Sequence, residues 1–416
     1  MQVDWEKILA ARAKTIVGFQ IRSFFHLTEK PEVISFAGGF PADSGFPTAE
    51  IKEALACLLE TEGKEALQYG PTEGIFELRQ FIARKMAGEG ISAPVESIMI
   101  TNGSQQGLDL VFRLLLDPHD YILVEEPGYI GGLGAIQNYQ GTRVGIPLGK
   151  EGLDLDYLEK KLKLMKMKGR KPKCIYTIPN FQNPTGAVLP LEGRRRLLEL
   201  ASEYDFLIVE DNPYGEICFE GEKLPSIKSL DKEGRVIYLG SFSKIFVPGI
   251  RVGWVLAPAP FMNKLILAKQ ATDLCSNSLG QRLLCQVLRS GFLAGHVEKL
   301  VKHYRLKRDI ILESMERYFP PQVQFTRPRG GFFTWVSFPS SLYPPAGEIL
   351  LKALERKVAF VHGDGFYSTA GKIPSYEARF SFSQPAPEQL EEGIKRLGQL
   401  LYEMQRLSKS AAVSGS

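Results

Sequence analysis

Six short apolar runs recur through the middle of the chain, each bounded by charged or turn-forming residues: SIMITNG (97–103), YILVEEP (121–127), KCIYTIP (173–179), FLIVED (206–211), RVIYLGS (235–241) and GWVLAP (253–258). Amphipathic stretches such as SQQGLDLVFRLLL and LEGRRRLLELASEYD separate them. Buried strands that alternate with amphipathic helices are typical of an α/β protein with a mostly parallel central sheet. In such a sheet, chemistry is expected beyond the carboxyl ends of the strands.

The pattern along the chain predicts four parts. Residues 1–45 hold too little apolar surface for a core of their own and are expected to pack over the rest. Residues 46–289 contain the six runs and would form a large domain. Residues 290–410 begin with a long helical stretch and continue with the runs FFTWVSF, KVAFVHG and EARFSFS, so they would form a smaller α+β domain. Residues 411–416 are expected to be a frayed end.

The charge and composition favour a small-molecule partner. The net charge of +4 over 416 residues suggests neither nucleic acid nor a membrane surface. The basic run KKLKLMKMKGRKPK (160–173) has Leu and Met at helical spacing, so it is interpreted as a solvated helix face. The five histidines form no metal-binding motif.

The cysteines and the N-terminus favour a cytoplasmic location. The five cysteines are scattered without a Cys-x-x-Cys pair, which gives little support to a disulfide framework. The N-terminal sequence MQVDWEKILAARAK has no apolar stretch long enough for a signal peptide or a membrane span.

The stretch SFSKIFVPGIR (241–251) places Lys244 directly after one of the predicted strands. A lysine can form a Schiff base with an aldehyde, and pyridoxal phosphate supplies that aldehyde together with a phosphate that needs several donors. Ser241, Ser243 and Arg251 are candidates to hold the phosphate, with Arg251 as a planar, charge-assisted fork. Alone, such a motif is more often a solvated loop, so the hypothesis depends on its neighbours.

A carboxylate ends the run FLIVED and a phenol follows it, in the sequence Asp211-Asn-Pro-Tyr214. The pyridine nitrogen of the cofactor must stay protonated for its ring to accept electrons, and a buried carboxylate favours that charged form. Asp211 is the candidate for this role. Tyr214 is a candidate to donate a hydrogen bond to the phenolate oxygen of the ring.

Polar or aromatic residues also follow three other predicted strands. Asn183, in the turn PNFQNPTG, is a second candidate donor to the ring oxygen. Ser104 and Gln105 open a predicted helix, and backbone amides at a helix N-terminus bind anions, so they are candidates to complete the phosphate site. Tyr129 could stack on the pyridine ring, although a loop tyrosine without a ligand is an equal alternative.

Taken together, GSQQGL, PGY, NFQNPTG, EDNPY, SFSK and PGIRVGW resemble, in order and spacing, the motifs of fold-type I pyridoxal-phosphate aminotransferases of class I/II. The segment IRSFFHLTEKPEVISFAGGFP and the later LQYGPTEG are similar to the group that contains 2-aminoadipate and kynurenine aminotransferases. The resemblance covers roughly residues 15 to 405.

The resemblance implies further site residues and a partner. Arg379, in EARFSFS, matches the arginine that binds the substrate α-carboxylate, and Gly39, in AGGFP, would offer a backbone contact beside it. Tyr69 matches a tyrosine that reaches the phosphate of the neighbouring subunit, which implies a homodimer with active sites at the interface. Arg22 matches a mobile arginine that recognises acidic substrate side chains. Asn183 is also expected near the substrate.

The resemblance implies ping-pong transfer of an amino group between an L-amino acid and 2-oxoglutarate. Lys244 would be released when the amino acid binds and would then act as the general base. One alternative is a β-lyase, because the same bound substrate can eliminate a leaving group. Another is a transcription regulator, but that would need about 60 or more additional residues before the ISFAGGFP motif, where only some 30 stand.

The preferred amino donor stays open at this point. 2-Aminoadipate, kynurenine, aromatic, leucine-like and methionine substrates are all compatible with the motifs, and we expect broad specificity. A set of aromatic residues would suit the rim of a pocket or the core equally well: Phe24, Phe25, Phe40, Phe46 and Tyr129.

Overall fold

The computed structural model describes residues 3–10, 12–13, 32–149, 151–368 and 375–414, with side chains as far as residue 407. The largest sheet has eight strands, in the order β2 (Ile98–Thr101), β9 (Gly253–Leu256), β8 (Val236–Ser241), β7 (Leu207–Asp211), β6 (Pro172–Thr177), β3 (Tyr121–Glu126), β4 (Thr142–Gly149) and β5 (Gly152–Leu153). Strands β8, β7, β6, β3 and β4 run parallel, whereas β9 is antiparallel to both of its neighbours. Each of the six apolar runs coincides with one strand, with β6 beginning one residue before its run, which confirms the predicted α/β class with a mostly parallel sheet.

Strand β4 lies outside the six runs. Its sequence TRVGIPLG contains two glycines and a proline, and most of its residues are only half-buried. It therefore lacks the continuous apolar run of a central strand, and its place beside the short edge strand β5 explains why it needs none.

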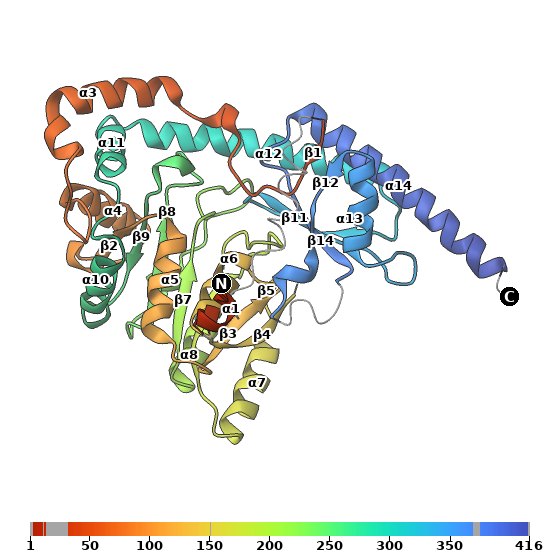
Figure 1. Cartoon of the computed structure of the whole chain (residues 1–416), viewed down its shortest axis with the longest axis horizontal. Helices are drawn as coiled ribbons and strands as arrows, with labels where there is room; N and C mark the ends of the chain where they lie inside the picture. The colour runs from red at the N-terminus through yellow and green to blue at the C-terminus, as the bar shows by residue number, and fades with distance from the viewer. Residues whose placement is uncertain (1–2, 11, 14–31, 150, 369–374, 415–416) are drawn as a thin grey trace.

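Helices cover both faces of this sheet (Figure 1). Alternate residues of β3 point to opposite faces, so Ile122 and Val124 enter one core cluster and Leu123 enters another. The first cluster includes residues of α5 and α6, and the second includes residues of α7 and α8. The helices of this part of the chain are α3 (Thr48–Ala66), α4 (Phe76–Gly88), α5 (Ser104–Leu115), α6 (Ile130–Asn138), α7 (Leu155–Met167), α8 (Leu191–Glu203), α9 (Ile227–Leu230), α10 (Ala259–Asp273) and α11 (Ser278–Arg289).

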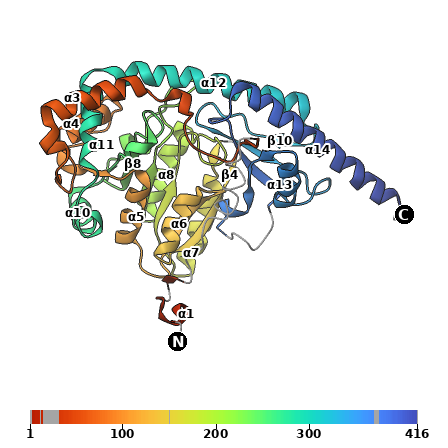
Figure 2. The same ribbon diagram turned by 45° about the horizontal axis from the view of Figure 1, so that its top comes forward.

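A second, antiparallel sheet follows in the chain, in the order β10 (Gln324–Phe325), β11 (Phe333–Ser337), β14 (Glu377–Ser381) and β13 (Val361–His362). The helices α12 (Phe292–Tyr318), α13 (Ala346–Glu355) and α14 (Pro387–Ser414) belong to this region. Helices α12 and α14 pack side by side, and α12 runs along the top of the molecule from α11 (Figure 2). Arg289, with which the first domain is expected to end, is the last residue of α11, and α12 begins at Phe292.

The N-terminal residues that the structure describes are short elements. Helix α1 spans Trp5–Ile8, and β1 (Ile34–Ser35) pairs in parallel with β12 (Val358–Ala359). Phe36, directly after β1, is fully buried in the main core cluster. The residues around β1 therefore pack against the C-terminal part of the chain, and they bring Ala37 and Gly39 toward the large sheet.

The basic run at 160–173 spans the end of α7 and the start of β6. Leu158, Leu162 and Met165 of α7 are buried, while Lys160, Lys163 and Lys166 are exposed. Within the ranges given above, none of the helices combines the length and the apolar character needed to cross a bilayer.

Candidate active site

A cavity of about 600 Å³ lies beyond the carboxyl ends of β6, β7 and β8. It is lined by nearly all of the candidate residues, which come from segments spread over more than 300 positions: Gly39, Ser104, Gln105, Tyr129, Asn183, Asp211, Tyr214, Ser241, Ser243, Lys244, Arg251 and Arg379. Parallel strands end at one edge of a sheet, so the loops that follow them converge there.

Tyr69 and the N-terminal candidates do not line this cavity. Tyr69 follows α3 and is 77% exposed on the surface of the chain. Arg22, Phe24 and Phe25 lie outside the described residues. Phe40 lines the cavity, whereas Phe46 packs against the main core, so the two remaining aromatic candidates of this segment have different environments.

Lys244 projects into the cavity from the turn after β8. Its Nζ donates a hydrogen bond of 2.8 Å to the carbonyl oxygen of Gly39 and lies over the rings of Tyr214 and Phe332. Burial lowers the pKa of Lys244 to about 8, and the positive charges of Arg379 and Arg251 act in the same direction. At neutral pH a larger fraction of this amine is therefore uncharged and nucleophilic than in an exposed lysine.

Asp211 ends β7 and is 1% exposed. Its Oδ2 accepts a hydrogen bond of 3.0 Å from the hydroxyl of Tyr176, while its Oδ1 is buried and has no partner among the described residues. Burial raises the pKa of Asp211 to about 7, and the Tyr176 hydrogen bond opposes that rise. A buried carboxylate oxygen without a partner is costly, so it fits a site that receives an N–H donor from a bound molecule.

A hydrogen-bonded chain joins three other candidates. The side-chain amide of Asn183 donates to the Tyr214 hydroxyl over 3.4 Å, and Nη1 of Arg379 donates to Oδ1 of Asn183 over 3.1 Å. Nη2 of Arg379 donates to the carbonyl oxygen of Ala37, and the guanidinium lies 4.5 Å from the centre of the Phe333 ring.

The two ends of this chain of hydrogen bonds are both buried. Burial raises the pKa of Tyr214 and lowers that of Arg379 to about 10. Nε of Arg379 has no partner in the described part of the chain. The phenol therefore stays protonated at neutral pH, and the guanidinium stays charged and ready for an anion.

The N-terminus of α5 forms one wall of the cavity, and two glycines allow other parts of the chain to approach it closely. Gly103 precedes Ser104 with φ of +76°, a conformation that favours glycine. A Cβ on Gly253 would come within 2.7 Å of the Ser104 nitrogen, and a Cβ on Gly103 would come within 2.5 Å of Arg251. These glycines let the helix N-terminus, β9 and a guanidinium meet, which is an arrangement that binds an anion.

The other phosphate candidates have unequal roles in this geometry. The Ser243 amide donates to Oγ of Ser241 over 3.1 Å, so the two serines form one turn at the cavity wall. The side chain of Gln105 is engaged elsewhere, because it donates to the carbonyl oxygen of Gly131 and accepts from the Tyr129 hydroxyl. One N–H of the Gln105 side chain is left, so Gln105 can offer that N–H or its backbone amide to an anion.

Two buried residues support the site without having been singled out from the sequence. Tyr176 holds Asp211, as described above. Glu125 accepts hydrogen bonds from the backbone amide of Ile178, from the side chain of Gln182 and from the hydroxyl of Thr177, so it fixes the turn that presents Asn183. The polar pair at the end of the apolar run YILVEEP was the only sequence signal for Glu125.

The chain belongs to the aminotransferase class I and II family, whose profile matches residues 31–397. It is therefore a fold-type I aminotransferase, as the resemblance implied. It is 42% identical over 403 residues to aromatic-amino-acid aminotransferase 1 of Thermococcus litoralis, with 96% of this chain and 95% of the relative covered.

Solved structures give the same result. A kynurenine aminotransferase of Pyrococcus horikoshii, crystallised with PMP, has a TM-score of 0.92 at 40% identity and covers 96% of this chain and 98% of its own. An α-aminoadipate aminotransferase of Thermus thermophilus, complexed with N-(5'-phosphopyridoxyl)-L-leucine, has a TM-score of 0.89 at 38% identity, with 97% and 100% covered. These relatives agree with the aminotransferase hypothesis and do not support the lyase or regulator alternatives.

Pyridoxal phosphate is the cofactor of this family, and the residues of the cavity fit it. The partnerless Oδ1 of Asp211 suits a protonated ring nitrogen, and the glycine-lined N-terminus of α5 with Arg251 suits a phosphate. The Lys244 side chain lines the same cavity.

Proposed function

We propose that this chain transfers an amino group between an L-amino acid of aromatic, kynurenine, 2-aminoadipate or long aliphatic type and 2-oxoglutarate, by a ping-pong mechanism. One observation carries the proposal. Among the described residues, an amine of lowered pKa, a buried carboxylate oxygen without a partner and a buried guanidinium without a carboxylate partner all face one cavity. When bound, pyridoxal phosphate supplies the aldehyde and the electron-accepting ring that amino transfer needs.

Lys244 has two roles in this proposal. Its amine would hold the aldehyde of the cofactor in the resting enzyme, and once released by the amino acid it would take the α-proton. The carbonyl of Gly39, which accepts a hydrogen bond from Lys244, fixes the direction of this flexible side chain. The rings of Tyr214 and Phe332 exclude water on one side of the amine.

The remaining residues bind and orient. Asp211 would keep the ring nitrogen protonated, and Tyr214 and Asn183 would be the donors to the ring oxygen. Arg379 binds the α-carboxylate of the substrate in a bidentate pair, because its buried guanidinium still has donors to offer. The backbone around Gly39 lies beside that carboxylate, since a Cβ on Gly39 would stand 3.9 Å from Nη1 of Arg379.

The range of donors rests on the lining of the cavity and on the relatives. Phe40, Tyr129, Ile130 and Ile178 give the cavity apolar walls that suit aromatic and long aliphatic side chains. The names of the relatives cover aromatic amino acids, kynurenine and 2-aminoadipate. Arg22 would recognise an acidic side chain of the donor or of 2-oxoglutarate, as in the group that the N-terminal segment resembles.

The proposal is tested by the two half-reactions of the purified enzyme loaded with pyridoxal phosphate. Addition of L-glutamate, L-phenylalanine or L-2-aminoadipate is expected to abolish the visible absorption band of the cofactor, and excess 2-oxoglutarate should restore it. A spectrophotometric titration with each amino acid measures both steps. A chain that binds no pyridoxal phosphate, or whose spectrum none of these amino acids changes, would contradict the proposal.

The variant Arg379→Met is the control for substrate recognition in the same titration. It removes the guanidinium but keeps an unbranched apolar stem, so cofactor binding should persist. The concentration of L-phenylalanine needed for half of the spectral change should rise on the order of 100-fold, because a buried, charge-assisted pair is lost. An unchanged concentration would show that Arg379 does not bind the α-carboxylate.

We also propose a homodimer in which Tyr69 reaches the cofactor phosphate of the partner subunit. Tyr69 is one of the most exposed aromatic residues that the structure describes, and Leu67 beside it is also exposed. Burial of Tyr69 and Leu67 in an interface between two subunits would explain why both are exposed on a single chain. Sedimentation analysis is expected to give twice the mass of one chain, and Tyr69→Phe should weaken pyridoxal phosphate binding several-fold. A monomer with full activity would contradict the proposal.

A cytoplasmic location is the last part of the proposal. The five cysteines are all free, although two of them are deeply buried and three lie nearer the surface: Cys57, Cys174, Cys218, Cys275 and Cys285. Proteins of oxidising compartments usually pair their cysteines. Cell fractionation with an antibody to the chain would test this, and recovery outside the cytoplasmic fraction would refute it.

A further inference from the structure

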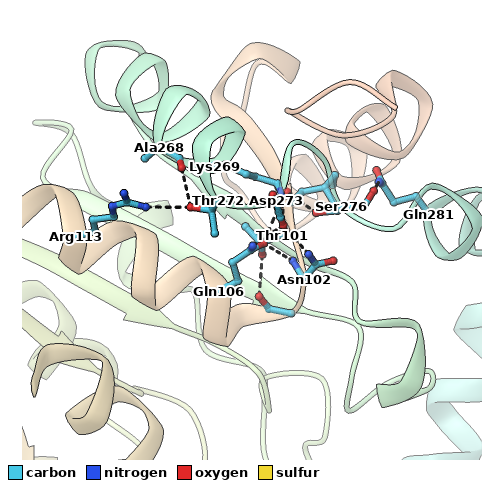
Figure 3. Close-up of polar contacts among 12 residues, drawn as sticks. Thr101, Asn102, Gln106, Arg113, Ala268, Lys269, Thr272, Asp273, Ser276 and Gln281 are labelled. Atoms are coloured by element: carbon cyan, nitrogen blue, oxygen red, sulfur yellow. Dashed lines mark hydrogen bonds and ion pairs between the residues drawn. The ribbon is translucent and has the colours of Figure 1, made fainter. Parts of the chain in front are cut away.

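A cluster of four side chains lies behind the N-terminus of α5, outside the cavity described above. It consists of Asn102 and Gln106, which flank the start of α5, and Lys269 and Asp273, which are near the end of α10. Figure 3 shows these side chains converging between the two helices. We call them the Asp273 cluster. None of them lines the active-site cavity.

Asp273 is the acceptor at the centre of this cluster. Its Oδ2 accepts from the Asn102 side chain over 2.7 Å and from the Gln106 side chain over 2.6 Å (Figure 3). Nζ of Lys269, whose side chain is fully buried, donates to both carboxylate oxygens over 2.7 and 2.9 Å. A carboxylate is the one side chain of this size that can accept from all of these donors at once.

The cluster fixes the backbone just before the anion site. The amide of Asn102 donates to Oε1 of Gln106 over 2.8 Å, so both the main chain and the side chain of Asn102 are held. The carbonyl oxygen of Asn102 in turn accepts from Nη2 of Arg251 over 3.2 Å. The next residue is Gly103, which approaches Arg251 closely and leads directly into Ser104. Asp273 is thus linked by one residue to the proposed phosphate-binding arginine.

We propose that Asp273 is a positioning residue for the cofactor phosphate, acting through Asn102 on Arg251 and on the first turn of α5. This inference rests on the proposed function, because it assigns the anion site to the phosphate of pyridoxal phosphate. Arg251 has the left-handed backbone conformation, with φ of +56°, and its Nη1 donates to the carbonyl oxygen of Pro248 in its own turn. The Asn102 carbonyl is the anchor that ties the guanidinium to α5.

Substitution of Asp273 by asparagine should disturb this anchor without changing the volume of the side chain. An amide has one acceptor oxygen, and its NH₂ group would face the NH₂ groups of Asn102 and Gln106 or the ammonium of Lys269. The buried Lys269 would also lose its counter-charge. The side chain of Asn102 would then be held less firmly, and the Arg251 guanidinium, which keeps its hydrogen bond to Pro248, would be less well oriented by the Asn102 carbonyl.

The test compares the binding of pyridoxal phosphate and of pyridoxal, which lacks the phosphate, to enzyme stripped of its cofactor. The dissociation constant of pyridoxal divided by that of pyridoxal phosphate measures what the phosphate contributes to binding. In Asp273→Asn this ratio is expected to fall by on the order of tenfold, because a charge-assisted contact to the anion is weakened, while pyridoxal binds as in the wild type. The milder variant Asn102→Ala should lower the ratio in the same direction.

Asp231→Asn is the matched control. Asp231 is equally part of a buried network, because it accepts from Lys228 and from the backbone amide of Val236, but it precedes β8 at the end opposite to the cavity. This variant should lower the melting temperature and leave the ratio unchanged. If Asp273→Asn weakens the binding of pyridoxal phosphate and of pyridoxal equally, Asp273 has a merely structural role and the inference is overturned.

The outcomes also separate this inference from the proposed function. Wild-type protein that binds no pyridoxal phosphate would contradict the proposed function itself. Wild-type protein that prefers pyridoxal phosphate, together with an Asp273→Asn variant of the same preference, would leave the proposed function intact and overturn the inference. If Asp273→Asn does not fold, the ratio measured for Asn102→Ala tests the inference. This variant removes only the half-buried Asn102 side chain from the cluster.

Discussion

Replacement of Lys244 by alanine is expected to lower the rate of amino transfer by about 10³- to 10⁴-fold. The variant loses both the covalent attachment of the cofactor and the base that takes the α-proton, and positioned proton transfer alone contributes up to this amount. Steady-state transfer from L-glutamate, in enzyme saturated with pyridoxal phosphate, measures the loss. Residual transfer should increase when a small amine such as methylamine is added, because it replaces the missing base.

Lys244→Arg separates the chemistry of the amine from its charge. The arginine keeps a cation near Tyr214 and Phe332, but it stays protonated and does not attack the aldehyde. It should therefore be as inactive as the alanine variant. Transfer within tenfold of the wild-type rate in either variant would exclude Lys244 as nucleophile and base.

Replacement of Asp211 by asparagine is expected to lower kcat by about 10²- to 10³-fold. The amide oxygen can still accept from Tyr176, but the negative charge that keeps the ring nitrogen protonated is gone. Stopped-flow measurement of the half-reaction with L-glutamate isolates this effect from substrate release. A wild-type half-reaction rate in Asp211→Asn would refute the role given to Asp211.

The stability of the cofactor-free protein provides the control for this variant. The folded-state pKa of Asp211 is raised to about 7 from 3.8, so the folded protein binds this proton more tightly than the unfolded chain. The ionised carboxylate therefore opposes folding, with a cost that grows from about pH 4 to about pH 7 and is complete above that range. At about pH 8 the cofactor-free Asp211→Asn variant should therefore melt at the same temperature as the wild type or higher. That result would show that the variant loses activity without losing its fold.

The catalytic candidates at strand ends were predictable from local sequence. Asp211 ends one apolar run and Lys244 follows another, and the parallel arrangement of such runs places their ends at one edge. Asn183 and Ser104 were found in the same way. Gly39, Arg379 and Tyr69 were not, because their segments lie outside the large sheet, and only the resemblance to a family pointed to them and to Arg22.

The residues that hold the candidates in place were not predictable. In the sequence, Tyr176 is one more apolar residue of a predicted central strand. Its hydroxyl donates a hydrogen bond to Asp211 only because β6 and β7 are neighbours in the sheet. Asp273 reads as a polar residue at a helix end, yet it binds residues that lie 167 and 171 positions earlier. Gln105 was expected as part of the anion site, and the contact of its side chain with Tyr129 was not foreseen.

The sequence alone determined the alternation of strands and helices, since a buried strand or an amphipathic helix is recognised by the spacing of apolar residues over one short window. It also determined which polar groups stand at the strand ends. The tertiary structure decided which groups touch: Lys244 meets the carbonyl of Gly39 across 205 positions, and Arg379 meets Asn183 across 196. Such contacts depend on how whole layers pack, and no local periodicity encodes the distance between segments so far apart in the chain.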